Sequence, residues 1–90
     1  MSQGLKSEVE RVISSEELTH LNWYEGRAPR ADEVGIVQVG NSWRVYSTDE
    51  RANAIYDTTY ENEDTALGDF LPRLRATNRY FAMRENRLGR

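Results

Sequence analysis

One histidine, two groups of carboxylates and a set of arginines are the residues of this chain that could perform chemistry. His20 is the only histidine, and cysteine is absent. Nucleophilic catalysis needs a hydroxyl or thiol with a base within hydrogen-bond reach. No serine lies in a G-x-S-x-G sequence, and neither a P-loop nor a G-x-G-x-x-G motif is present. We therefore interpret His20 as a polar residue between a helix and a loop, and we predict that the protein is not an enzyme.

The carboxylates could supply an acid–base pair or oxygen ligands for Mg²⁺ or Ca²⁺. They are Asp49 and Glu50, followed by Glu61, Glu63 and Asp64. Their spacing is not that of an EF-hand loop. Acidic residues at the start of a helix also interact favourably with the helix dipole, which gives the second group a structural reason. We therefore predict no metal and no cofactor.

Charge is distributed unevenly along the chain. Residues 49–64 hold six acidic residues and one arginine, whereas residues 65–90 hold six arginines and two acidic residues. Arginines mixed with aromatic residues are typical of grooves that bind nucleic acids, and here they are Arg73, Arg75, Arg79, Arg84 and Arg87 with Tyr80 and Phe81. The pI near 5.1 is unlike that of most nucleic-acid-binding domains. We favour pairing of these arginines with the acidic stretch, within the fold or across a homodimer, over binding of nucleic acid.

The elements that position these residues begin with a short amphipathic helix. Apolar residues recur at helical spacing at Leu5, Val9, Val12 and Ile13. Ser14 and Glu17 fit a capping box, which predicts a second helical turn from about Ser15 that directs Leu18 and Leu21 inward. One bent helix and two separate helices both fit this pattern. Gly26, Pro29 and Ala31 then indicate a loop.

Three β-strands follow in the sequence. Val34–Val39 and Ser42–Ser47 flank Gly40-Asn41 and predict a hairpin, because glycine allows the positive φ that such turns require. Residues 54–61 predict a third strand. Trp43 and Tyr46 lie on opposite faces of the second strand, so one helical layer cannot bury both. We therefore expect Tyr46 on an open face of the sheet.

The C-terminal part of the chain predicts a helix. Asn62 is a suitable N-cap, and an apolar stripe follows at Leu67, Phe70, Leu71 and Leu74. Pro72 removes one backbone hydrogen bond and typically costs ~3 kcal/mol inside a helix. We expect a kink near Pro72, or a break and a second segment with Tyr80, Phe81 and Met83. Residues 82–90 are expected to fray.

Together these elements predict an α+β fold. It has one N-terminal helix, or two, a three-stranded antiparallel meander, and a C-terminal helix packed on one sheet face. Ninety residues make one domain, 1–90, with a core over about residues 5–81. No apolar run reaches the roughly 20 residues that cross a bilayer, and no secretory signal follows Met1. With cysteine absent, we expect a cytoplasmic protein that does not enter membranes.

Several short sequences occur in an order that resembles a known family. They are Tyr24, Gly26 and Pro29, then Trp43–Tyr46 and Asp49–Arg51, and then Glu63–Ala66 and Phe70–Leu74. This order, over roughly residues 20–75, is similar to the small immunity proteins of bacterial polymorphic-toxin and contact-dependent-inhibition systems. The chain departs from the pattern at Ala52, where a glycine is expected, and at Pro72, in a helix expected to be continuous.

The resemblance implies a protein that binds a cognate toxin domain and blocks its active site. The acidic stretch would then occupy an electropositive cleft of a toxin that acts on RNA, DNA or a dinucleotide. Exposed tyrosines beside acidic residues are typical of protein-binding surfaces. The predicted partner-binding residues are Tyr46, Asp49, Glu50, Arg51, Tyr56, Asp57, Tyr60 and Glu61. A generic protein-binding adaptor or regulatory module is the alternative, and an exposed sheet edge leaves a homodimer open.

Overall fold

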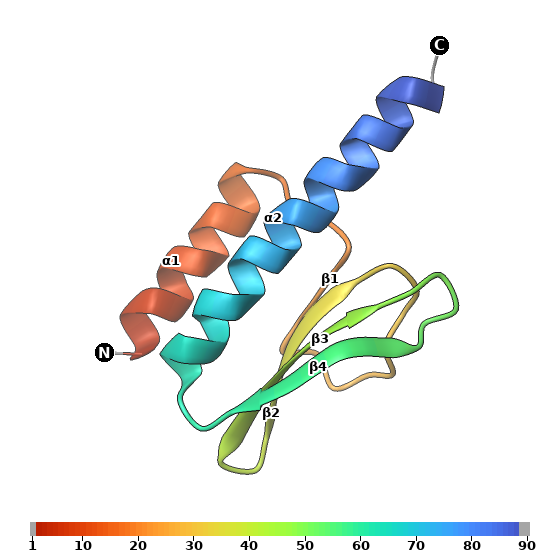
Figure 1. Cartoon of the computed structure of the whole chain (residues 1–90). Coiled ribbons are helices and arrows are strands. Elements are labelled where there is room, and N and C mark those ends of the chain that lie inside the picture. The colour runs from red at the N-terminus through yellow and green to blue at the C-terminus, as the bar shows by residue number, and fades with distance from the viewer. Residues whose placement is uncertain (1, 89–90) are drawn as a thin grey trace.

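The computed structural model describes the backbone of residues 2–88 and the side chains of residues 4–85. Over these residues two helices and four strands follow one another in the order α1 (Ser2–Ser15), β1 (Leu21–Trp23), β2 (Val34–Val39), β3 (Ser42–Thr48), β4 (Ala54–Tyr60) and α2 (Glu63–Leu88). The strands form one sheet in the order β1-β2-β3-β4. β1 is parallel to β2, whereas the other neighbouring pairs are antiparallel. The α+β class is confirmed, and the sheet has a fourth, parallel strand in addition to the meander (Figure 1).

The prediction of a second helical turn near Ser15 is wrong. α1 ends there because the Leu18 N–H donates to Ile13 O at 2.9 Å and the Glu17 N–H donates to Ser14 O at 3.2 Å. This pair of hydrogen bonds is a Schellman motif, with Glu17 in the left-handed conformation at φ 54°. Leu21 therefore belongs to β1 and pairs with Val34 of β2 instead of continuing a helix.

Both helices lie on the same side of the sheet (Figure 1). α2 packs directly on β2, β3 and β4, and α1 packs on α2. The core between these layers is apolar and is formed by Val9, Val34, Ile36, Val45, Ala66, Leu67, Phe70 and Leu74. Each large aliphatic or aromatic side chain buried in this way contributes roughly 1.5–3 kcal/mol to folding. We call the side of the sheet toward α2 the helix face and the other side the outer face.

α2 is one uninterrupted helix, so the expected break at Pro72 is wrong. The helix begins as predicted with Asn62 as its N-cap, because the Thr65 N–H donates to Oδ1 of Asn62 at 3.0 Å. Pro72 has no N–H to donate to the carbonyl of Gly68. Both residues are exposed to solvent. Water can therefore hydrogen-bond this carbonyl, and the buried side of the helix is undisturbed. Residues 82–88, which were expected to fray, belong to α2, and residues 89–90 lie outside the described residues.

The hairpin of β2 and β3 forms as predicted, with Gly40 at φ 61° in its turn. β4 pairs with β3 on the other side and is an edge strand. Its register against β3 shifts between Val45 and Ser47, where Tyr56 adopts a φ of 53°. This bulge bends the edge strand. Between residues 2 and 88, neither helix combines the length and the apolar character needed to span a bilayer.

Candidate functional site

The structure contradicts the expected exposure of Tyr46. Tyr46 does lie on the outer face, but only 1% of it is exposed, because the loop between β1 and β2 covers it. Its hydroxyl accepts a hydrogen bond from Nδ2 of Asn22 at 2.9 Å and donates one to Oε2 of Glu33 at 3.0 Å. The ring occupies the space above Gly35, where a Cβ would overlap it. Tyr46 is therefore a structural residue and is not available to a partner.

Glu33 and Arg27 hold this loop on the outer face. Arg27 donates from Nη2 to Oε1 of Glu33 at 2.9 Å and from Nη1 to Oε2 at 3.2 Å, and the Arg30 N–H donates to Oε2 at 3.1 Å. Burial by itself would raise the pKa of Glu33, but these hydrogen bonds outweigh it and hold the pKa below its usual value. The buried carboxylate thus stays ionised and paired, which fits a structural role.

Asp49, Glu50 and Arg51 lie in the turn between β3 and β4. Oδ1 of Asp49 accepts hydrogen bonds from the N–H groups of Arg51 and Asn53, both at 2.9 Å. These bonds lower the pKa of Asp49 and show that its carboxylate shapes the turn. Ala52, found where the family pattern has glycine, adopts a φ of 65°. Glu50 and Arg51 are exposed.

Asp57, Tyr60 and Glu61 do not join these turn residues. Asp57 lies on the outer face in a bidentate ion pair with Arg44, whose Nη2 is 2.6 Å from Oδ2, and this hydrogen-bonded pairing lowers the pKa of Asp57. Tyr60 is half-buried and donates its hydroxyl to Oδ2 of Asp69 at 2.8 Å. Glu61 is exposed at the opposite end of β4 from the turn, about 20 Å along a strand of this length. The acidic stretch is therefore not one continuous surface.

Two of the C-terminal arginines pair within the fold, but with acidic residues outside the stretch 49–64. Arg73 donates to Asp69 from Nε at 2.9 Å and from Nη2 at 2.8 Å, and it also donates from Nη1 to Tyr56 O at 2.6 Å. Arg75 pairs with Glu16, which directly follows α1, at 2.6 Å. Arg73 and Arg75 are therefore paired within the fold, but the expected pairing with the acidic stretch is wrong for both.

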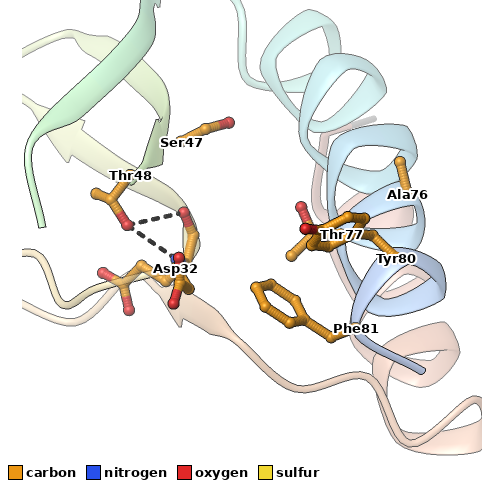
Figure 2. A pocket seen from close by; sticks show the side chains of 8 residues that line it. Asp32, Ser47, Thr48, Ala76, Thr77, Tyr80 and Phe81 are labelled. Atoms are coloured by element: carbon orange, nitrogen blue, oxygen red, sulfur yellow. Dashed lines mark hydrogen bonds between the residues drawn. The ribbon is translucent and has the colours of Figure 1, made fainter. Parts of the chain in front are cut away.

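A cleft of about 310 Å³ opens between the sheet and the C-terminal half of α2 (Figure 2). Its sheet side comes from the segment before β2 and the end of β3, and its other side comes from α2. The lining residues are Asp32, Glu33, Ser47, Thr48, Ala76, Thr77, Tyr80 and Phe81. α2 has 26 residues and is about 39 Å long, whereas a seven-residue strand spans about 23 Å. The helix therefore extends beyond the sheet, and the cleft lies where the two separate.

Four exposed apolar side chains belong to the elements that form or adjoin this cleft. The described residues include five large exposed hydrophobic side chains, of which Ile55, Tyr56, Tyr80 and Met83 belong to β4 and the distal half of α2. Ile55 pairs with Ser47, which lines the cleft, and Arg73 hydrogen-bonds both Ser47 and the Tyr56 carbonyl. The fifth, Val39, lies at the opposite end of the β2–β3 hairpin. We call these four side chains and the cleft lining the cleft surface.

Of the residues of this surface, only Tyr56 is among the partner-binding residues predicted from the sequence. For Tyr80 and Met83 the sequence predicted only that they belong to a helical segment after Pro72, with no role in partner binding. The usable signal was helix length, since a continuous helix of this size must extend past strands of six or seven residues.

Two side chains that line the cleft are engaged within the fold. The Thr48 hydroxyl is engaged, donating to Arg30 O at 2.6 Å and accepting from the Glu33 N–H at 2.8 Å. His20 stacks on Phe81 with its ring centroid 4.6 Å away. Within the described part of the chain, no three His, Cys, Asp or Glu side chains are placed to hold a metal ion. No protein-family model, curated protein or solved structure matches the chain, so its function must be inferred from this geometry.

Proposed function

We propose that this protein binds another protein through the cleft surface, and that its partner is a cognate bacterial toxin domain which it neutralises. The observation that carries the proposal is that Tyr80 lines the cleft and that three further exposed hydrophobic side chains, Ile55, Tyr56 and Met83, belong to β4 and α2 next to it. Exposed hydrophobic side chains concentrated on one part of a small protein are typical of an interaction site. Tyrosine in particular is enriched among the residues that dominate binding energy.

The exposure of the two tyrosines supports this role over a structural one. Tyr56 is 77% exposed and Tyr80 is 58% exposed, so neither contributes much to the core. Tyr56 is nevertheless held in place, because its carbonyl accepts from Arg73 and its backbone forms the bulge of β4. A partner can therefore bury these rings with little loss of conformational entropy.

Polar residues surround the apolar part, as at other protein interfaces. Asp32 lines the cleft, and Glu50 and Arg51 are exposed in the turn that follows β3. In the acidic stretch, Asp57 is neutralised by Arg44, and Asp49 bonds to backbone N–H groups. Among the acidic residues of the stretch whose side chains are open to a basic partner, Glu50 is therefore the nearest in sequence to the cleft.

The toxin as partner comes from the sequence resemblance, and the structure shows which of the matching residues serve the fold. Val45 and Tyr46 are buried, and the Thr65 N–H donates to Asn62, the N-cap of α2 that directly precedes the matching segment Glu63–Ala66. These residues support a shared fold. Binding specificity would then depend on the exposed side chains of the cleft surface, in which Tyr56, Tyr80 and Met83 lie outside the matching segments.

Co-expression with the product of the neighbouring gene tests the proposal, with growth rescue and co-purification as measurements. Tyr56→Ala and Tyr80→Ala should each weaken the complex by at least about 30-fold if the tyrosines are interface hot spots. Val39→Ala is the matched control, because Val39 is 57% exposed but remote from the cleft; its affinity should stay within about threefold.

Equal affinity of all three variants would contradict the proposed surface. Co-purification without growth rescue would retain the binding surface but favour an adaptor over an immunity protein. A neighbouring gene product that neither binds nor is neutralised would contradict the toxin as partner.

A further inference from the structure

We infer that the cleft receives an arginine side chain contributed by the partner protein. This inference rests on the proposed function and identifies the chemical group that enters the site. The cleft volume of about 310 Å³ is at the lower end for ligand pockets, which suits one long side chain better than a nucleotide.

The charge of the lining favours a cation. Asp32 and Glu33 are both lining residues, but the carboxylate of Glu33 lies toward the outer face, where it is paired with Arg27 and bonded to Tyr46. Asp32 makes no side-chain hydrogen bond or ion pair with any other described side chain or backbone group, and no basic residue is part of the lining. The exposed arginines nearest in sequence, Arg30 and Arg51, are not among the lining residues. The cleft thus contains one uncompensated acceptor carboxylate.

The α2 side of the cleft is suited to a planar cation with an apolar stem. Tyr80 and Phe81 place two aromatic rings there (Figure 2), and Ala76 also belongs to the lining. Guanidinium groups stack on aromatic faces and are less strongly hydrated than ammonium groups. Arginine also offers two parallel N–H donors to a carboxylate, which lysine cannot do. These properties favour arginine over lysine.

The backbone fixes Asp32 at the mouth of this cleft. Its N–H donates to Asp49 O at 3.0 Å, and its φ is 56°. Aspartate and asparagine are among the non-glycine residues that adopt this left-handed conformation most readily. Of the other polar side chains of the cleft, the Thr48 hydroxyl bonds to Arg30 O and the Ser47 hydroxyl accepts from Arg73, whereas Thr77 offers an uncharged hydroxyl. Asp32 is therefore the charged acceptor that an incoming cation would meet.

A titration of the full chain with small peptides tests the inference. The probe is acetyl-Gly-Arg-Gly-amide, and its control carries citrulline, which has nearly the same shape without the charge. Amide chemical shifts of residues 47–48, 77 and 80 should change saturably with the arginine peptide. An exposed ion pair of this kind predicts about three- to fivefold weaker binding of the citrulline peptide.

Two variants assign the effect to the cleft. Asp32→Asn keeps a residue that tolerates positive φ, and it should reduce arginine binding to the citrulline level. Tyr80→Leu should also weaken binding, and this exposed position is not needed for folding. Glu8→Gln removes an exposed charge of α1, which contributes no residue to the lining, and should change nothing. Equal binding of the two peptides, or unchanged arginine binding by Asp32→Asn, would overturn the inference.

The peptide titration and the co-expression experiment fail independently. If the neighbouring gene product binds through Tyr56 and Tyr80 but the arginine peptide does not bind, the inference is wrong and the proposed function stands. If the peptide binds as expected but no toxin is neutralised, the cation site stands and the proposed function is wrong.

Discussion

At the residue scale, Tyr46 organises the outer face of the sheet. Its ring fills the space over Gly35, and its hydroxyl links Asn22 of β1 to Glu33 of the covering loop. Each of these polar groups is buried, so each would be destabilising without its partner. The alternation along β3 predicts that Tyr46 lies on an open face. In the structure Tyr46 is instead the centre of a second, smaller buried layer between the sheet and the loop.

This arrangement predicts opposite effects for two glycine substitutions. Gly35→Ala should destabilise the protein by about 1–3 kcal/mol, because the added methyl overlaps the Tyr46 ring, which the loop prevents from moving. Gly68→Ala is the matched control: it lies on the exposed side of α2 with no side chain within 4 Å, and it should stabilise by about 1 kcal/mol. Urea unfolding measures both changes. Equal stability of the Gly35 variant and the wild type would contradict the tight packing at this position.

At the element scale, α2 both completes the core and extends beyond it. Its first half buries Ala66, Leu67, Phe70 and Leu74 against the sheet, whereas Tyr80 and Met83 of its second half are exposed. The same helix therefore supplies stability and one side of the cleft. A break at Pro72 would separate these two functions, and the structure avoids it by placing the proline toward solvent.

The position of Pro72 predicts that replacing it increases stability. Pro72→Ala restores a hydrogen bond to the Gly68 carbonyl and removes a steric clash. The two effects together are worth about 3 kcal/mol. Proline also restricts the unfolded chain, which offsets roughly 0.4–1 kcal/mol of that gain. We expect a net stabilisation of about 2 kcal/mol in thermal or urea unfolding, with binding at the cleft surface unchanged. A loss of stability would show that Pro72 is required for the path of α2.

At the scale of the whole molecule, four carboxylates link stability to pH. The pKa values of Glu16, Glu33, Asp49 and Asp57 all lie below their usual values, chiefly because of hydrogen bonds from arginines or backbone N–H groups. A lowered pKa in the folded state means that the unfolded chain takes up protons first as the pH falls. Their contribution is fully present above the unfolded pKa values near 4 and is lost as the pH falls through the folded ones.

We therefore expect the thermal midpoint to be nearly constant from pH 6 to 8 and to fall steeply below about pH 4.5. Glu33→Gln should destabilise the protein at neutral pH by about 2–3 kcal/mol, because it leaves Arg27 without its buried counter-charge. The variant should also show a shallower decline at acidic pH. Scanning calorimetry from pH 3 to 8 measures both effects, and an unchanged acid profile of the variant would contradict the assigned role of Glu33.

Features set by neighbouring residues could be predicted from the sequence by itself. The β2–β3 hairpin follows from alternating strands around Gly40, and the start of α2 follows from Asn62 as N-cap. β1 could not be predicted, because three residues are too few to show alternation and their partner strand begins eleven residues later. The end of α1 was misjudged because Ser14 and Glu17 match a capping box, whereas the left-handed position of the Schellman motif holds Glu17 instead of the usual glycine or asparagine.

The sequence thus determined the α+β class, the hairpin and the apolar stripe of α2, since each depends on residues a few positions apart. Tertiary structure decided which side chains are available to a partner. Tyr46 is buried by a distant loop, Asp57 is neutralised by Arg44, and Tyr80 is exposed because α2 is longer than the sheet. The physical reason is that exposure and charge compensation depend on segments far apart in the chain, which local periodicity does not encode.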